Sequence, residues 1–144
     1  WDKNDIGRGA RPGNRFEPGK KPMSTMAPTI VFDKNDDLFL ITGSPGGSDI
    51  PAAILRVITG VIDFNLDIGE ATMLPRIHKD WPYKGLEHER TVSRDIVRRL
   101  KSMGHSTEYE MTIGSTQSIM IKDGINYGYA DLRRPGAAVT VQEK

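Results

Sequence analysis

A glycine-rich turn at residues 43–48 carries the strongest chemical signal in the sequence. It consists of Gly43-Ser44-Pro45-Gly46-Gly47-Ser48 and lies between a β-rich run and the start of an apolar helical pattern. Adjacent glycines allow the backbone to approach a ligand closely, and unpaired N–H groups at a helix start favour negative charge. Gly46 and Gly47 are therefore candidate donors to an oxyanion. A tight strand-to-helix connection that needs glycine for geometry alone explains the same residues.

A nucleotide-phosphate loop fits the sequence less well. Such loops continue into Gly-Lys-Ser/Thr, and no such triplet follows Gly47. The stretch from Gly13 to Lys21 also fails, because the spacing to Gly19-Lys20 is one residue too long and Lys21 stands where a hydroxyl residue is required. We therefore favour an oxyanion over a nucleotide phosphate as the anionic ligand.

Two neighbouring hydroxyl residues, Ser24 and Thr25, form a second candidate site. They lie between Pro22 and Pro28, just before a β-rich run. Hydroxyls in such a turn can donate hydrogen bonds to a carboxylate without adding charge, or they can satisfy the local backbone. Taken alone, the pair favours the local structural interpretation.

Several other kinds of site find little support. The 144 residues include no cysteine, which excludes a disulfide, a thiol nucleophile and a thiolate zinc site. His78, His88 and His105 show no metal-ligand spacing, so no metal or other cofactor is expected, and His78 alone is worth following. Arg133 and Arg134 could bind an anion, but solvated or structural arginines are the default interpretation. The 20 basic residues balance 19 acidic ones, which leaves no field to recruit nucleic acid or an anionic membrane.

Strands and helices must position these residues. Apolar residues recur every three or four positions from residue 50 to 64, with Ser48 as a helix N-cap and Pro51 in the first turn. Asp123-Gly124 is a strong hairpin signal. We expect strands at 29–33, 38–42, 107–111, 117–122 and 126–130, and helices at 50–64, 67–71 and 93–104. This order predicts an α+β fold in which antiparallel strands pack against a helical layer.

Composition divides the chain into two segments. Residues 1–22 are rich in proline, glycine and charge and show no hydrophobic period, so we expect an irregular segment there. Residues 23–144 suffice for one domain, or part of one, around a single core. No stretch reaches the length of a membrane-spanning helix. The chain begins at Trp1 with no initiator methionine or signal peptide, and we expect a piece of a longer protein.

Residues 18–48 closely resemble the small-subunit core of the γ-glutamyltranspeptidase family. This segment, PGKKPMSTMAPTIVFDKNDDLFLITGSPGGS, holds the hydroxyl pair and the glycine turn in the order and at the separation typical of that family. The resemblance continues in order to residue 136, so it covers nearly the whole chain from residue 14. It includes VIDF at 61–64, EA at 70–71, PRIH at 75–78, GSTQS at 114–118 and residues 131–136.

The resemblance implies the N-terminal-nucleophile hydrolase fold, an αββα sandwich built by two subunits cut from one precursor. This chain would form part of such a sandwich. In the family, the cut exposes a threonine that attacks the γ-amide of glutathione or a similar donor, and its own α-amine serves as the base. The implied partners are the large subunit and the N-terminal part of the small subunit, which would carry that threonine outside this chain. Bacterial members are usually periplasmic or secreted, and we expect the same location here.

The resemblance also implies roles for matching residues. Ser24 and Thr25 correspond to the paired hydroxyls that hold the α-carboxylate of the γ-glutamyl group. Gly46 and Gly47 correspond to the glycines whose N–H groups stabilise the tetrahedral oxyanion.

Met26 and Ser48 border the same pocket in the family. One departure is Thr25, where the family usually has serine. The threonine keeps the hydroxyl donor, and its methyl group tightens the pocket or restricts the rotamer.

We therefore expect part of a γ-glutamyl transferase or hydrolase that works through a γ-glutamyl-threonine intermediate. Two alternatives stay open. Without that threonine, the chain could be a catalytically inert structural or assembly fragment whose open sheet edges seek a partner. A related amidase acting on poly-γ-glutamate or on β-lactam acyl side chains would keep the chemistry and change the substrate. The hydroxyl pair Ser24-Thr25 favours a donor with a free α-carboxylate.

Overall fold

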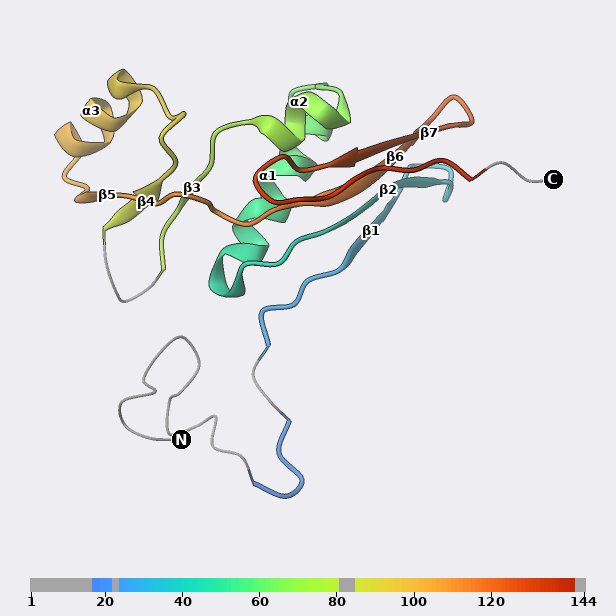
Figure 1. Ribbon diagram of the computed structural model, residues 1–144, viewed down its shortest axis with the longest axis horizontal. Coiled ribbons are helices and arrows are strands. Elements are labelled where there is room, and N and C mark those ends of the chain that lie inside the picture. Colours follow the sequence, from blue (N-terminus) through green and yellow to red (C-terminus); the bar gives the residue numbers. More distant parts are fainter. Residues whose placement is uncertain (1–16, 22–23, 81–84, 142–144) are drawn as a thin grey trace.

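The structure, a computed structural model, describes residues 17–21, 24–80 and 85–141. The chain forms a four-stranded sheet covered on one face by two helices, and beside it a small three-stranded sheet with a third helix (Figure 1). This arrangement confirms the predicted α+β fold. Of the irregular segment predicted at 1–22, residues 17–21 contain a turn, and the rest lies outside the described residues. In the described ranges, no helix has both the length and the apolar character of a membrane span.

The four-stranded sheet joins two hairpins that are far apart in the sequence. Its strand order is β1-β2-β6-β7, with every neighbouring pair antiparallel. Asp123 (φ 53°) and Gly124 (φ 73°) have the left-handed backbone that a two-residue hairpin turn requires, so the predicted Asp-Gly turn is confirmed. The strands are β1 (Thr29–Phe32), β2 (Leu38–Gly43), β6 (Gln117–Lys122) and β7 (Ile125–Ala130).

Two consecutive helices follow β2. A short 3₁₀ turn, η3 (Gly47–Asp49), leads into α1 (Ile50–Ile62), and α2 (Ile68–Met73) follows. The predicted N-cap at Ser48 is wrong: η3 moves the start of α1 by one residue, so Asp49 is the N-cap, without a side-chain cap bond. In α2, the Asp67 side chain accepts from the Glu70 N–H and the Glu70 side chain accepts from the Asp67 N–H, which forms a capping box.

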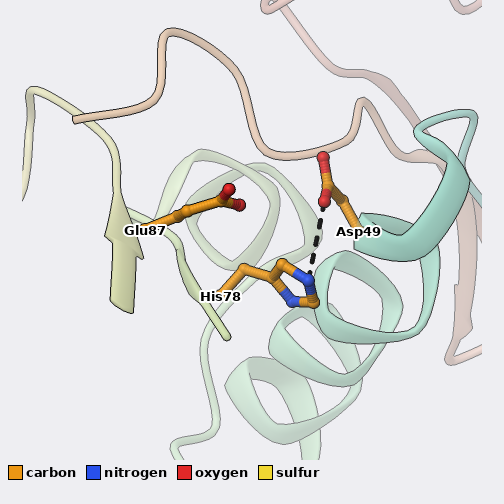
Figure 2. A group of neighbouring side chains, drawn as sticks. All are labelled: Asp49, His78 and Glu87. Carbon is orange, nitrogen blue, oxygen red and sulfur yellow. Dashed lines mark ion pairs between the residues drawn. The ribbon is translucent and has the colours of Figure 1, made fainter. Parts of the chain in front are cut away.

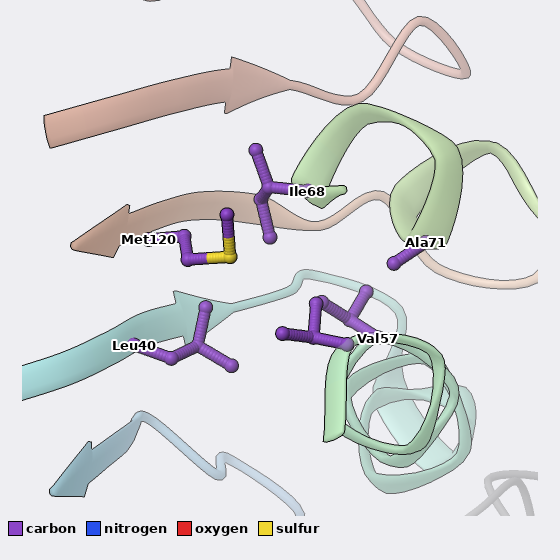
Figure 3. Close-up of a cluster of buried hydrophobic side chains, with 6 residues drawn as sticks. Leu40, Val57, Ile68, Ala71 and Met120 are labelled. Carbon is purple, nitrogen blue, oxygen red and sulfur yellow. The ribbon is translucent and has the colours of Figure 1, made fainter. Parts of the chain in front are cut away.

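The main hydrophobic core lies between the helices and one face of the four-stranded sheet. Its buried members come from α1, α2, β2 and β6, and Figure 3 shows them converging between the two layers. They are Leu40, Val57, Val61, Ile68, Ala71 and Met120. Val57 and Val61, from the apolar stripe that predicted α1, therefore pack on the sheet, whereas Phe64 at the end of the predicted stripe lies beyond α1 and is 66% exposed.

The other face of this sheet is apolar and uncovered within the described part of the chain. Side chains alternate between the two faces along a strand. Leu40 and Met120 therefore point to the core, whereas Ile30 and Ile119 lie on the outer face and are 59% and 43% exposed. We call these two residues the outer apolar face.

The small sheet was only partly predicted. It has the order β3-β4-β5, in which β3 and β4 are antiparallel and β4 and β5 are parallel. The strand predicted at 107–111 exists but pairs with β4, and β3 was missed because two residues give no periodic signal. The predicted caps of the third helix are confirmed, since Ser93 accepts from the Ile96 N–H and Gly104 (φ 91°) follows its end. These elements are β3 (Ile77–His78), β4 (Leu86–His88), α3 (Arg94–Ser102) and β5 (Thr107–Tyr109).

Candidate active site

The glycine turn connects β2 to η3 and depends on glycine at two positions. Gly46 has a φ of 143° and Gly47 a φ of 61°, values that L side chains rarely adopt. A Cβ at Gly46 would lie 3.2 Å from the Gly114 Cα, whereas a Cβ at Gly47 would meet no described atom within 4 Å. A side chain at Gly46 would therefore require the neighbouring backbone to move by a few tenths of an ångström, whereas one at Gly47 would meet none of the described atoms.

The turn presents two neighbouring backbone N–H groups, those of Gly46 and Gly47. Among the described residues, no acceptor receives a hydrogen bond from the N–H of Gly46 or Gly47. The Gly46 carbonyl, by contrast, accepts from the Asp49 N–H at 3.2 Å, which closes the turn into η3. The arrangement offers two neighbouring donors at the start of a helical segment, which suits a developing negative charge.

The structure brings the hydroxyl pair to the glycine turn. Thr25 Oγ1 donates to the Gly47 carbonyl at 2.7 Å. Ser24 is exposed, and its Oγ accepts from the Met26 N–H at 3.1 Å. Met26 itself is 78% exposed. Two candidate sites that lie 22 residues apart in the sequence are thus one surface, joined by a direct hydrogen bond.

Ser48 is held differently from the other candidates. Its Oγ donates to Asp80 Oδ2 at 3.3 Å, in the segment that follows β3. In this structure the Ser48 hydroxyl therefore bonds toward the small sheet.

A buried loop supports the turn from behind. The Ser44 Oγ accepts from the Ser115 N–H at 2.8 Å and donates to the Pro45 carbonyl at 2.7 Å. Gly114 (φ 68°) packs so closely that a Cβ there would lie 2.6 Å from the Ala53 Cβ. The sequence showed glycine and serine at these positions but not that they hold the turn in place.

Four charged residues form a buried charge network that fixes this loop: Arg76, Glu89, Asp131 and Arg133. Arg76 donates to Asp131 Oδ2 at 2.8 Å and to the Ile113 carbonyl at 3.0 Å. Arg133 donates two hydrogen bonds to the Glu89 carboxylate, at 2.6 and 2.7 Å. The structural interpretation of Arg133 is thereby confirmed, because its donors are used inside the protein.

The network also lowers the pKa values of its carboxyl groups. Burial alone would raise the pKa of Glu89, but hydrogen bonds from the Arg133 guanidinium and from two backbone N–H groups hold it below its ordinary value. Burial likewise opposes ionisation of Asp131, whose pKa is nevertheless lowered by the Arg133 N–H and by the charge of Arg76. Both groups therefore favour the folded state when ionised.

We expect Glu89→Gln to change how stability depends on pH. A lowered folded-state pKa contributes stability fully above the ordinary value, 4.5 for Glu89, and this contribution disappears as the pH falls through the folded value. The melting temperature of the variant should therefore lie below that of the wild type at neutral pH, and the gap should narrow below about pH 4.5. Thermal denaturation of the full-length protein across this range measures it. An equal gap at about pH 7 and about pH 3 would contradict the assignment.

A second polar group lies beside the turn. Asp49, His78 and Glu87 come from η3, β3 and β4, and Figure 2 shows their side chains close together. One potential ligand atom of each lies within 4.8 Å of the others. Sequence spacing among the histidines gave no sign of this group, because two of its members are carboxylates from separate segments.

Comparison with known proteins places these features in a family context. A model of the family described as gamma-glutamyltranspeptidase matches residues 2–141. The glutathione hydrolase proenzyme of Escherichia coli (strain K12) is 41% identical over 121 residues, which cover 83% of this chain and 21% of that protein. The corresponding proenzyme of Bacillus subtilis (strain 168) is 36% identical over 134 residues, covering 91% of this chain and 22% of that protein.

Solved structures show the same likeness. The crystal structure of a gamma-glutamyltranspeptidase mutant from Helicobacter pylori superposes with a TM-score of 0.77 at 37% identity, covering 83% of this chain and 66% of that chain. The predicted α+β architecture is therefore also that of a solved structure of the family. The chain spans about a fifth of the length of the curated relatives it matches.

Proposed function

This chain belongs to the gamma-glutamyltranspeptidase family, and we propose that it supplies the substrate carboxylate clamp and the oxyanion hole of an enzyme that cleaves γ-glutamyl amides of glutathione-like donors. One observation carries the proposal. The N–H groups of Gly46 and Gly47 have no acceptor among the described residues, and they lie next to the hydroxyl pair, whose Thr25 donates to the Gly47 carbonyl. Donors for an oxyanion and donors for a carboxylate are both required to hold a γ-glutamyl group during acyl transfer.

The proposed reaction is an acyl transfer through a covalent ester. A threonine hydroxyl, which we assign to the protein outside this chain, attacks the γ-carbonyl carbon while its α-amine accepts the proton. The carbonyl oxygen becomes an oxyanion, and Gly46 and Gly47 donate their N–H groups to it. Collapse of this intermediate breaks the C–N bond, and the leaving amine takes up the proton. Water or an amino acid then attacks the γ-glutamyl ester and regenerates the threonine.

The clamp would hold the α-carboxylate of the donor. Because Ser24 Oγ accepts from the Met26 N–H, its own proton stays available for donation to a carboxylate. Thr25 has a single hydroxyl proton, which the Gly47 carbonyl receives. Thr25 can bond the substrate only by rotating away from Gly47, so this residue links the clamp to the glycine turn. Met26 and Ser48 would border the bound donor.

The rest of the assembly is proposed from the family. The matching relatives are named proenzymes, which supports a precursor that is cut to produce the nucleophilic threonine. We assign residues 23–144 to the C-terminal portion of the small subunit and residues 1–22 to an irregular segment that leads into it. The large subunit and the N-terminal part of the small subunit would complete the site, and the protein would act in the periplasm or outside the cell.

We expect Thr25→Val in the full-length enzyme to lower kcat by roughly fivefold to tenfold and to raise KM, because the change removes a hydrogen bond worth about 1 kcal/mol from the Gly47 carbonyl and a donor from the clamp. Thr25→Ser restores the hydroxyl and should restore both constants. Steady-state kinetics with a γ-glutamyl anilide measure them. A higher KM with unchanged kcat would instead mean that Thr25 stabilises the bound substrate and the transition state equally.

Thr29→Val is the matched control. The Thr29 hydroxyl also donates to a backbone carbonyl, that of Ala27 at 3.0 Å, but it lies at the start of β1. Its loss should leave both constants near the wild-type values. Wild-type kinetics for Thr25→Val as well would overturn the assignment of Thr25 to the site.

A further inference from the structure

Three side chains with metal-ligating atoms converge beside the glycine turn. Asp49 ends η3, His78 ends β3, and Glu87 lies in the middle of β4. His78 and Glu87 are direct partners in the antiparallel β3–β4 ladder, which places both side chains on one face of the small sheet. One carboxylate oxygen from each acid and one imidazole nitrogen all lie within 4.8 Å of one another. In Figure 2 the three side chains point toward a common space.

The group is buried. The side chain of Asp49 is 10% exposed and that of His78 is 11% exposed, while Glu87 is 1% exposed as a residue. His78 Nε2 is a fully covered atom that makes no hydrogen bond to any residue in the described ranges. It lies 3.7 Å from Asp49 Oδ1, which is too far for a hydrogen bond. A covered imidazole nitrogen without a hydrogen bond calls for a specific explanation.

The geometry fits a small divalent cation. Zn²⁺ binds imidazole nitrogen and carboxylate oxygen at about 2.0–2.2 Å in a tetrahedral arrangement, so neighbouring ligand atoms lie about 3.4 Å apart. The 3.7 Å separation of His78 Nε2 and Asp49 Oδ1 needs only a small contraction to match. Imidazole favours Zn²⁺ over Mg²⁺ or Ca²⁺, which prefer oxygen ligands alone. A water molecule can supply the fourth ligand.

We propose that Asp49, His78 and Glu87 bind Zn²⁺ at a site with three protein ligands that joins the start of α1 to the small sheet. The Asp49 N–H also bonds the Gly46 carbonyl at 3.2 Å. The cation therefore fixes the end of the glycine turn from a position outside the proposed clamp and oxyanion hole. The site does not require the γ-glutamyl chemistry, and its test is independent of that proposal.

The experiment uses the full-length protein after dialysis against a chelator, titrated with Zn²⁺ alone in a calorimeter. We expect one Zn²⁺ per chain and a rise in melting temperature with Zn²⁺, because a ligand that binds the folded state stabilises it. His78→Ala, Asp49→Asn and Glu87→Gln should each weaken binding by at least about tenfold. Mg²⁺ at equal concentration should bind far more weakly, and bound Co²⁺ should show the visible absorption of a tetrahedral site.

His105→Ala is the matched control, because this histidine is exposed just after α3. It should bind Zn²⁺ as the wild type does. The carboxamide variants keep the shape of each side chain, and the melting temperature of the unmodified protein gives a readout that does not depend on any variant folding. The proposal would be overturned if the wild-type protein did not bind Zn²⁺. It would also be overturned if all three ligand variants bound Zn²⁺ as tightly as the wild type does. The buried group would then be a His–Asp pair without a cation.

Discussion

Gly46→Ala is expected to slow acylation of the full-length enzyme by roughly 100- to 1,000-fold, the usual effect of losing an oxyanion donor. The new Cβ would lie 3.2 Å from the Gly114 Cα and 3.4 Å from the Asp49 Cβ. The φ of 143° at Gly46 also disfavours any L side chain. The turn must shift to relieve both conflicts, and this shift displaces the N–H groups of Gly46 and Gly47. Pre-steady-state release of the anilide leaving group measures the acylation rate.

Gly43→Ala is the control for this experiment. Gly43 belongs to the same turn, but an added Cβ meets no described atom within 4 Å and its φ lies outside the left-handed region. The substitution should leave acylation close to the wild-type rate. If Gly46→Ala acylates as fast as Gly43→Ala, the glycine turn is only a strand-to-helix connection and the proposed oxyanion hole is wrong.

Arg76→Met is expected to destabilise the folded protein by about 3–5 kcal/mol, because breaking a buried ion pair leaves uncompensated charge and unpaired acceptors. Arg76 is 1% exposed, and its guanidinium donates to Asp131 as well as to the carbonyls of Ile113 and Thr72. Methionine fills similar space but removes the positive charge beside Asp131 and leaves the Ile113 carbonyl without its donor. The Thr72 carbonyl keeps its hydrogen bond from Arg133. Chemical denaturation, followed by tryptophan fluorescence and by far-UV circular dichroism, measures the change.

Arg98→Met provides the comparison on the surface. Arg98 forms an ion pair with Asp95 on α3, but both side chains are exposed, 78% and 81% respectively. Exposed pairs contribute little because water screens them. The denaturation midpoint should therefore stay at the wild-type value. A similar loss of unfolding free energy in the two variants would show that burial does not increase the contribution of the charge network to stability.

Local signals predicted most of the larger elements. The apolar stripe from residue 50, the caps around α3 and the Asp123-Gly124 turn each act over a few residues, so they are legible in the sequence. The hydroxyl pair and glycine turn were identified as a joint site only through the family resemblance. No local pattern indicated the hydrogen bond from Thr25 to the Gly47 carbonyl, because it depends on where the segment before β1 lies relative to the glycine turn.

Long-range pairing escaped prediction. The parallel partnership of β4 with β5 joins short strands that carry no periodic pattern. The charge network draws its four members from three separate segments, and each looks like an ordinary surface charge in the sequence. The same reason hid the grouping of His78 with Asp49 and Glu87. These contacts are properties of the folded topology, and residue spacing does not encode them.

The outer apolar face of the four-stranded sheet has a consequence for how the chain's stability is defined. Ile30 and Ile119 keep much of their surface in water unless another layer covers them. β1 and β7 also form the two edges of this sheet in the described residues, and open edges favour association. Any surface that packs here adds its binding free energy to that of folding. If that surface is a second copy of this chain, the melting temperature should rise with protein concentration, because folding and association are then coupled.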